Sequence, residues 1–311
     1  MNRRAFLAAS LTVPARAAAQ ARQAGAPAPT VPPFRLPDNV EMRRGLAYAR
    51  YQGNRELRLD LFLPKERPAA PMPAIVYIHG GGWRNGNRSA FHRQAAHMAT
   101  LGYAGACIEY RLSGEATWPA AIHDAKAAVR WVRSQAAGLG IDPRRIGAAG
   151  GSAGGHLAAL LGTTSHRKDL EGPGGHAKFS SRVRAVAAFN PAVDLVSFGK
   201  QAGANLDNSI AAFLGKSYAE APALWELATP LLHVSARSAA FLFLHGSADV
   251  TVPIQQSLDM QARLQAAGVV AEFFPAEGAT HGFFNRPPWF EPTLQRMAGF
   301  FDAHLKPDSR R

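Results

Sequence analysis

The stretch that decides the fold runs from residue 146 to residue 161 and reads IGAAGGSAGGHLAALL. An apolar run at 146–149 precedes the pattern G-x-S-x-G at 150–154, and a helix-like segment follows. This order predicts a buried strand, a sharp turn and a helix, and a serine on so tight a turn presents its hydroxyl away from both elements. Ser152 is therefore the candidate nucleophile. Because the chain holds 29 glycines, the pattern needs support from the rest of the sequence.

A second glycine-rich segment has the sequence HGGGW and follows another apolar run, 74–78. Glycines at such a position let backbone N–H groups face a bound substrate. When a serine attacks an acyl carbon, each preorganised N–H donor stabilises the developing oxyanion by roughly 3–4 kcal/mol. We expect Gly81 and Gly82 of this segment, with Ala153 after the serine, to supply these donors.

Two further strand-like runs end near a candidate acid and a candidate base. Asp249 comes just after the apolar run 241–244, and His281 ends the loop that follows the next such run. The order Ser152, Asp249, His281 is the chain order of α/β-hydrolase triads. Glu277 is the rival acid because it lies closer to His281 in sequence. Asp249 is favoured because the acid must approach the imidazole from a neighbouring strand end.

The other histidines do not form a recognisable site. The chain has 11 histidines, without an H-E-x-x-H pattern and with only one cysteine, so we expect no metal site. His79 and His245 each precede a glycine at a strand end and are interpreted as structural. His123, His156 and His233 are interpreted as packed or partly exposed residues.

Five motifs together resemble a known family. They are HGGGW at 79–83, YRL at 110–112, GGSAGGHLA at 150–158, HGSAD at 245–249 with Val252-Pro253 after it, and GATHGF at 278–283. They resemble the α/β-hydrolase esterases, specifically the bacterial feruloyl-esterase-like and hormone-sensitive-lipase-like carboxylesterases and the arylformamidases. The resemblance covers about residues 57 to 305. Hormone-sensitive-lipase-like esterases usually carry an acidic residue where this chain has Gly151, which places the chain nearer the feruloyl-esterase-like branch.

The same reading predicts an α/β fold with a mostly parallel central sheet, flanking helices and a small cap insertion. One catalytic domain is expected at 40–306, with the cap at about 191–238. An antiparallel hairpin at the sheet edge is expected from 46–51 and 57–63, helices at 119–136 and 253–267, and a polar loop at 163–182. Buried strands are expected at 74–78, 104–110, 146–149, 185–189, 240–244 and 270–274.

The N-terminus has the layout of an export signal. Arg3 and Arg4 precede a modest apolar stretch, 5–13, and small residues follow at 17–19. We expect a signal peptide at 1–21, with paired arginines as in twin-arginine signals, and a periplasmic or secreted protein. The apolar stretch is too short to span a membrane, so no integral membrane association is expected. A flexible, proline- and alanine-rich lead-in is expected at 22–39.

Composition agrees with one large exported domain. The 311 residues are 47% hydrophobic, which is enough for a substantial core. The formal net charge is +13, and removing residues 1–19 would leave +10. The arginines are dispersed without a basic run, so no nucleic-acid partner is expected. Cys107, the single cysteine, cannot form an intrachain disulfide and is interpreted as a core residue.

The resemblance implies a serine hydrolase that cleaves carboxylic esters, with short-chain acyl or aryl groups, through an acyl-enzyme. No cofactor is expected, and the partner is a small-molecule ester. Trp83, Trp118 and Phe283 are the candidate substrate contacts. An arylformamidase-type amide hydrolase uses the same triad and remains the main alternative. A serine peptidase, or a non-catalytic ligand-binding protein on the same fold, is disfavoured.

Overall fold

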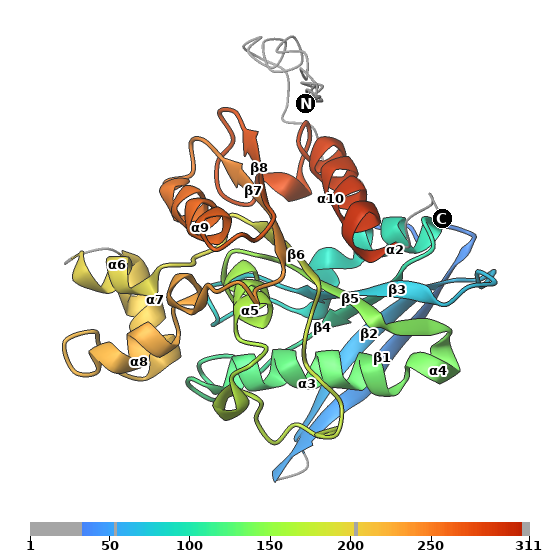
Figure 1. Cartoon of the computed structure of the whole chain (residues 1–311), viewed down its shortest axis with the longest axis horizontal. Coiled ribbons are helices and arrows are strands. Elements are labelled where there is room, and N and C mark those ends of the chain that lie inside the picture. The colour runs from blue at the N-terminus through green and yellow to red at the C-terminus, as the bar shows by residue number, and fades with distance from the viewer. Residues whose placement is uncertain (1–32, 53–54, 202–204, 307–311) are drawn as a thin grey trace, which may run out of the picture.

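The computed structural model describes residues 33–52, 55–201 and 205–306, whose centre is an eight-stranded sheet (Figure 1). The strands lie in the order β1-β2-β4-β3-β5-β6-β7-β8. Strands β3 to β8 run parallel, while β2 is antiparallel to both of its neighbours. The bounds are β1 Val40–Tyr51, β2 Arg55–Pro64, β3 Met72–Ile78, β4 Ala104–Ile108, β5 Ile141–Gly151, β6 Ala185–Phe189, β7 Ala240–Gly246 and β8 Ala271–Ala276.

All six predicted central strands are present, with small differences at their ends. β4 stops two residues earlier than predicted, and β5 begins at Ile141, five residues earlier. This extra segment pairs with Met72 across a register shift, which a simple apolar run could not reveal. The predicted edge hairpin is β1 and β2, and its turn at 53–54 lies outside the described residues.

Helices cover both faces of the sheet (Figure 1). Side chains of a strand alternate between the faces, so Phe241 and Phe243 of β7 point into one apolar core and Leu242 and Leu244 into the other. The first core includes α3, α5 and α9, and the second includes α2 and α10. The bounds are α2 His92–Thr100, α3 Ala120–Ser134, α4 Ala136–Leu139, α5 Ala153–Thr163, α9 Gln255–Ala266 and α10 Phe290–Leu305. In the described part of the chain, no helix is long and apolar enough to cross a membrane.

The polar segment predicted as a loop at 163–182 contains only one short 3-10 turn, η4 Lys168–Leu170. Two buried cations of α3 hold this loop. Lys126 Nζ donates to Thr164 O at 2.8 Å and to Glu171 Oε1 at 3.0 Å, and Arg130 Nη1 donates to Glu171 Oε2 at 2.8 Å. Since buried charges are stable only when paired, Glu171 fixes the loop against α3.

The predicted cap is an insertion of short helices between β6 and β7. Its described elements are α6 Leu195–Lys200, α7 Asn205–Leu214, α8 Pro222–Leu227 and the 3-10 turn η5 Pro230–His233. The ring of Phe213 in α7 stacks on the ring of Trp83, with centroids 4.7 Å apart. The backbone carbonyl of Phe213 accepts a hydrogen bond from Trp118 N at 2.8 Å. The Ser209 hydroxyl lies 4.0 Å from the point where a Cβ on Gly82 would be. Helix α7 therefore lies directly against the HGGGW loop.

Phe34, near the start of the described chain, packs on the core, while most of residues 33–39 are exposed. Phe34 contacts Phe62 and His92, with ring centroids 6.2 and 5.6 Å apart. Within the lead-in predicted for 22–39, Phe34 is thus held against the apolar core, and residues 22–32 lie outside the described residues. The predicted signal at 1–21 lies outside the described residues.

Candidate active site

The structure brings Ser152, Asp249 and His281 together at the carboxyl edge of the parallel strands. Ser152 follows β5, Asp249 lies in the loop after β7 and His281 lies in the loop after β8. His281 Nε2 is 3.0 Å from Ser152 Oγ, and His281 Nδ1 is 2.7 Å from Asp249 Oδ2. Both distances are hydrogen-bond distances, so the three side chains form a continuous relay.

The carboxylate of Asp249 is held in its ionised form. Burial alone would raise its pKa, but hydrogen bonds from His245, His281 and Val252 N hold the pKa well below its ordinary value. Oδ1 accepts from the N–H groups of Thr251 and Val252 at 2.9 and 3.0 Å. Oδ2 is the oxygen that His281 contacts.

An ionised Asp249 determines the tautomer of His281. A carboxylate can only accept, so Nδ1 of His281 carries the proton and donates it to Oδ2. Nε2 is then left unprotonated and can accept the hydrogen bond of the Ser152 hydroxyl. This is the arrangement that a general base needs before it removes a proton from a nucleophile.

The rival acid and the other strand-end histidines have different partners. Glu277 accepts a hydrogen bond from Ser247 Oγ at 2.8 Å. His79 stacks on Tyr110 with ring centroids 4.4 Å apart. His245 lies behind the triad. Its Nδ1 is 2.7 Å from Ser257 Oγ, and its Nε2 donates to Val252 O at 2.8 Å and lies 3.5 Å from Asp249 Oδ2. Thus His245, interpreted from sequence as structural, holds the loop of the acid and lies beside its carboxylate.

The turn that carries Ser152 is strained and tightly packed. Ser152 has φ +55°, in the left-handed region that few non-glycine residues adopt. A Cβ at Gly151 would come within 2.5 Å of Cζ of Phe284, whose ring fills the space beside the turn. Phe284 therefore explains the departure at Gly151 from the acidic residue of hormone-sensitive-lipase-like esterases. Sequence reasoning missed this contact because 133 residues of chain separate the two positions.

The predicted oxyanion donors belong to the glycine loop and to the start of α5. Gly81 and Gly82 have φ +115° and +59°, and no described group accepts a hydrogen bond from their N–H groups. Ala153 is the first residue of α5, where an N–H has no acceptor within the helix. A Cβ at Gly80 would lie 2.7 Å from Gly151 O, so the glycine loop touches the turn that holds Ser152. Their role as oxyanion donors stays a prediction.

The three candidate substrate contacts are largely buried. Trp83, Trp118 and Phe283 expose 2%, 7% and 5% of their surface. Trp83 stacks on the cap, and Phe283 packs edge-on against Phe284 and Trp289. The structure thus gives all three a packing role, and substrate contact by them stays a prediction. Sequence reasoning missed Phe213, the cap residue on which both tryptophans pack.

His156 connects the glycine loop to the cap and titrates abnormally. Its ring is fully buried, its Nδ1 accepts from Trp83 Nε1 at 3.2 Å, and its Nε2 donates to Ala228 O at 2.7 Å. Burial lowers the pKa of His156 to about 4, even though the bond to Ala228 opposes the shift. The folded protein therefore holds this ring neutral at a pH where the unfolded chain would protonate it.

We expect this histidine to make folding stability depend on pH. The folded pKa lies below the unfolded value of about 6.5, so its contribution is complete above pH 6.5 and is lost as pH falls towards 4, by about 3 kcal/mol at most. Urea unfolding of wild type and His156→Gln from pH 7.5 to 4.5 measures the effect. The stability difference between them should shrink as pH falls, and a constant difference would contradict the prediction.

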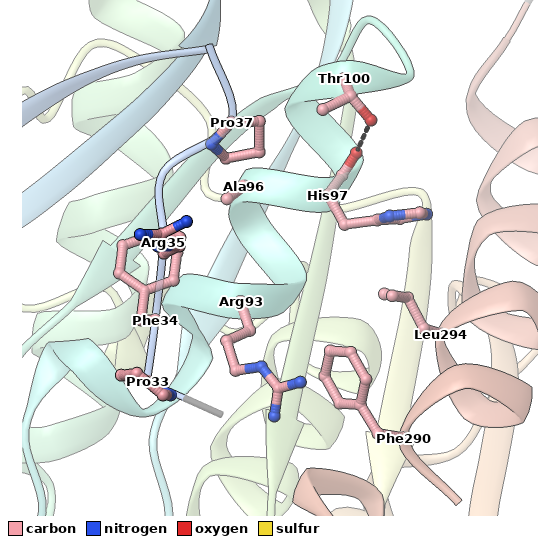
Figure 2. A pocket seen from close by; sticks show the side chains of 10 residues that line it. All are labelled: Pro33, Phe34, Arg35, Pro37, Arg93, Ala96, His97, Thr100, Phe290 and Leu294. Atoms are coloured by element: carbon pink, nitrogen blue, oxygen red, sulfur yellow. Dashed lines mark hydrogen bonds between the residues drawn. The ribbon is translucent and has the colours of Figure 1, made fainter. Parts of the chain in front are cut away.

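A separate hollow of about 330 Å³ lies between the N-terminal segment, α2 and α10 (Figure 2). Within it the Arg93 guanidinium lies over the ring of Phe290, 3.8 Å from its centroid. None of its lining residues belongs to the triad or the glycine loop. The residues that line this hollow are Pro33, Phe34, Arg35, Pro37, Arg93, Ala96, His97, Thr100, Phe290 and Leu294.

No group of three or more His, Cys, Asp or Glu residues suited to a metal ion occurs in the part of the chain that the structure describes.

Three solved structures that are similar to this chain are esterases. Esterase 2 of the planctomycete Thermogutta terrifontis aligns with a TM-score of 0.73 and 32% identity, covering 88% of this chain and 96% of that one. A truncated carbohydrate esterase from gut microbiota aligns with a TM-score of 0.74 and 31% identity, covering 85% and 95%. The Thermogutta enzyme has also been solved phosphoramylated by tabun, and that structure aligns with a TM-score of 0.72 and 32% identity over 89% of this chain and 99% of that one.

Two curated relatives come from Mycobacterium tuberculosis. Esterase LipQ is 33% identical over 239 residues, which cover 74% of this chain and 55% of LipQ. Esterase LipC is 30% identical over 230 residues, which cover 72% of this chain and 56% of LipC. The chain thus spans about half the length of these relatives. The BD-FAE family model matches residues 59–264, which is more than half of the chain. The chain therefore belongs to the BD-FAE family and has the α/β-hydrolase fold.

Proposed function

We propose that this protein is a serine hydrolase of carboxylic esters that acts through an acyl-enzyme. The observation that carries the proposal is the relay from Asp249 through His281 to Ser152, with contacts of 2.7 and 3.0 Å. The glycine loop supports it too, because a Cβ at Gly80 would lie 3.2 Å from the Cβ of Ser152. The esterase relatives and structural neighbours support the same reaction.

In the proposed acylation step, Ser152 Oγ attacks the ester carbonyl carbon while His281 Nε2 removes the hydroxyl proton. Negative charge then gathers on the carbonyl oxygen, where Gly81, Gly82 and Ala153 can donate hydrogen bonds. When the tetrahedral intermediate collapses, the bond to the alcohol oxygen breaks and His281 returns its proton to that oxygen. The alcohol leaves, and the acyl group stays on Ser152.

Deacylation repeats this sequence with water. His281 takes a proton from a water molecule as its oxygen attacks the acyl carbon, and the same N–H groups hold the second oxyanion. Collapse breaks the bond to Ser152 Oγ, and His281 returns the proton to it. Throughout, Asp249 stays ionised and stabilises the protonated imidazole, as its lowered pKa requires.

We infer that the substrates carry short acyl or aryl groups. The support is the position of α7, whose Phe213 stacks on Trp83 and whose Ser209 approaches Gly82. A helix so near the oxyanion loop limits the space for a long acyl chain. Within this class we propose acetyl or feruloyl esters of sugars, and the carbohydrate esterase among the structural neighbours supports this choice.

The test is hydrolysis of p-nitrophenyl esters of increasing acyl length by wild type and Ser152→Ala. Methyl ferulate, an acetylated sugar and an N-formyl aryl amine are assayed beside them. We expect wild type to hydrolyse the short esters fastest and to lose kcat/KM as the chain lengthens. Turnover of the formyl amine alone would replace the proposal with an arylformamidase, and binding without turnover would replace it with a ligand-binding protein.

We also propose export through the N-terminal segment, from the paired Arg3 and Arg4 before an apolar stretch. The full-length chain, expressed in a Gram-negative host, should appear in the periplasm or medium with residues near 1–21 removed. Arg3→Lys with Arg4→Lys should keep the protein in the cytoplasm if the signal is of the twin-arginine type. Unprocessed wild type in the cytoplasm would contradict export.

A further inference from the structure

Asn190, which follows β6, contacts the catalytic histidine from a fully buried position. Its exposed surface is 0%, and its Nδ2 lies 3.3 Å from both Nδ1 and Nε2 of His281. An atom in the ring plane at equal distance from both nitrogens would have to overlap the Cε1 atom between them. The amide therefore lies over the face of the imidazole, where it leaves both ring nitrogens free for Asp249 and Ser152.

The backbone around Asn190 is fixed by the strands that carry the triad. Asn190 N donates to Leu244 O of β7 at 2.8 Å, and Phe189 O accepts from Ser152 N at 2.9 Å. The next residue, Pro191, packs closely on α5. A Cβ built at Gly155 of α5 would lie only 2.9 Å from the Cβ of Pro191. Asn190 is thus anchored to the nucleophile turn on one side and to the strand before Asp249 on the other.

Two features of Asn190 are unfavourable for stability. Its φ is +37°, outside the regions that residues with a Cβ prefer. Its Oδ1 is buried and has no hydrogen-bond partner among the described residues. A backbone outlier and an unsatisfied buried amide persist where the surrounding structure requires them, and such features cluster at functional sites. A glycine would adopt the positive φ without strain and would have no buried amide oxygen. Packing alone therefore does not account for an asparagine at position 190.

We propose that Asn190 is a positioning residue whose carboxamide supports one face of the His281 ring during both proton transfers. The inference rests on the proposed function, because it assigns a role within the same triad. His281 is about one quarter exposed, so its ring needs a support on the buried side to stay aligned with both partners. The charged or titratable groups that face it are Asp249, and His245 behind that carboxylate.

The amide can serve both charge states of the ring. An N–H over a neutral imidazole meets the electron-rich ring face, whereas the amide oxygen would suit the imidazolium. No described hydrogen bond other than the contact with His281 holds the side-chain amide, so the proposal requires only a rotation about Cβ–Cγ to exchange the two atoms. An aspartate of the same shape would present oxygen in both orientations and would favour the protonated ring.

The decisive variants are Asn190→Gly and Asn190→Asp. Glycine tolerates the positive φ and removes the support, so we expect kcat to fall about 10- to 100-fold with little change in KM or thermal stability. Aspartate keeps the shape and should retain more activity than glycine. For the aspartate variant, the acid limb of the pH profile of kcat/KM should move to higher pH, because the carboxylate keeps the His281 ring protonated up to a higher pH.

His176→Gly is the matched control, since His176 also has a positive φ, +52°, but lies in the loop held by α3. The rate at which a fluorophosphonate labels the serine is measured for every variant, because labelling needs the triad but no particular ester. If the wild-type protein is labelled but hydrolyses no ester, the proposed function is wrong. The labelling rates of the variants would still test the role of Asn190 in that case. Wild-type kcat in Asn190→Gly, or an unmoved pH profile in Asn190→Asp, would overturn the proposal. If the glycine variant does not fold, the pH profile of the aspartate variant decides.

Discussion

Replacing Ser152 by alanine is expected to lower kcat/KM for short-chain esters by at least ~10⁴-fold while the protein stays folded. The hydroxyl is the group that attacks, and no other described side chain lies at hydrogen-bond distance from His281 Nε2 except the Asn190 amide. An amide nitrogen cannot replace the hydroxyl as a nucleophile. Ester hydrolysis followed at 405 nm, with circular dichroism of both proteins, measures activity and fold separately.

Asp249→Asn is the companion variant for that experiment. An amide that donates to His281 would favour the proton on Nε2, so the ring could no longer accept from Ser152, and turnover should fall about 10⁴-fold. Glu277→Gln is the matched control, because Glu277 accepts from Ser247 and does not reach the triad. Loss of activity in the control with retention in Asp249→Asn would reverse the assignment of the acid.

Gly154→Ala is expected to have the largest effect on stability. A Cβ there would overlap the backbone carbonyls of Ile78 and His79, which hold the end of β3 and the start of the glycine loop. Backbone atoms at a strand end cannot move aside like a flexible side chain. The free energy of unfolding should therefore fall by about 3 kcal/mol or more, although alanine is the better helix former. Chemical denaturation measures the change.

The same substitution should also reduce activity, because the displaced loop carries Gly81 and Gly82. Gly114→Ala is the control, since no atom lies within 4 Å of a Cβ built at that glycine. It should leave stability within about 0.5 kcal/mol of wild type and kcat unchanged. A Gly154→Ala protein as stable and active as the control would show that α5 and β3 are not so closely packed.

The sequence predicted the parallel strands and the three triad residues because each carries a local signal. Buried parallel strands read as short apolar runs, and the residues of the site sit just past the ends of these runs. The order of Ser152, Asp249 and His281 then placed all three at one edge. The pairing of Ile141 with Met72 had no such signal, because it depends on a register shift between two strands.

The contacts that support the site were not predictable in the same way. Phe284 against Gly151, Phe213 on Trp83 and Asn190 on His281 each join segments far apart in the chain. No local pattern reports such a contact, since an apolar or amide side chain in a loop has many possible neighbours. The one available signal was Asn190 itself, because asparagine after a buried strand tolerates the left-handed region better than most residues do.

The wide separation of the triad along the chain also bears on how activity arises during folding. Ser152 and His281 are 129 residues apart, and β6, the cap, β7 and β8 lie between them in sequence. Their contact can form only after the strands from β5 to β8 have paired, and contacts of such long range form slowly because much chain entropy is lost first. Partly folded chains are therefore catalytically silent, and recovery of ester hydrolysis during refolding should lag behind the recovery of helical signal.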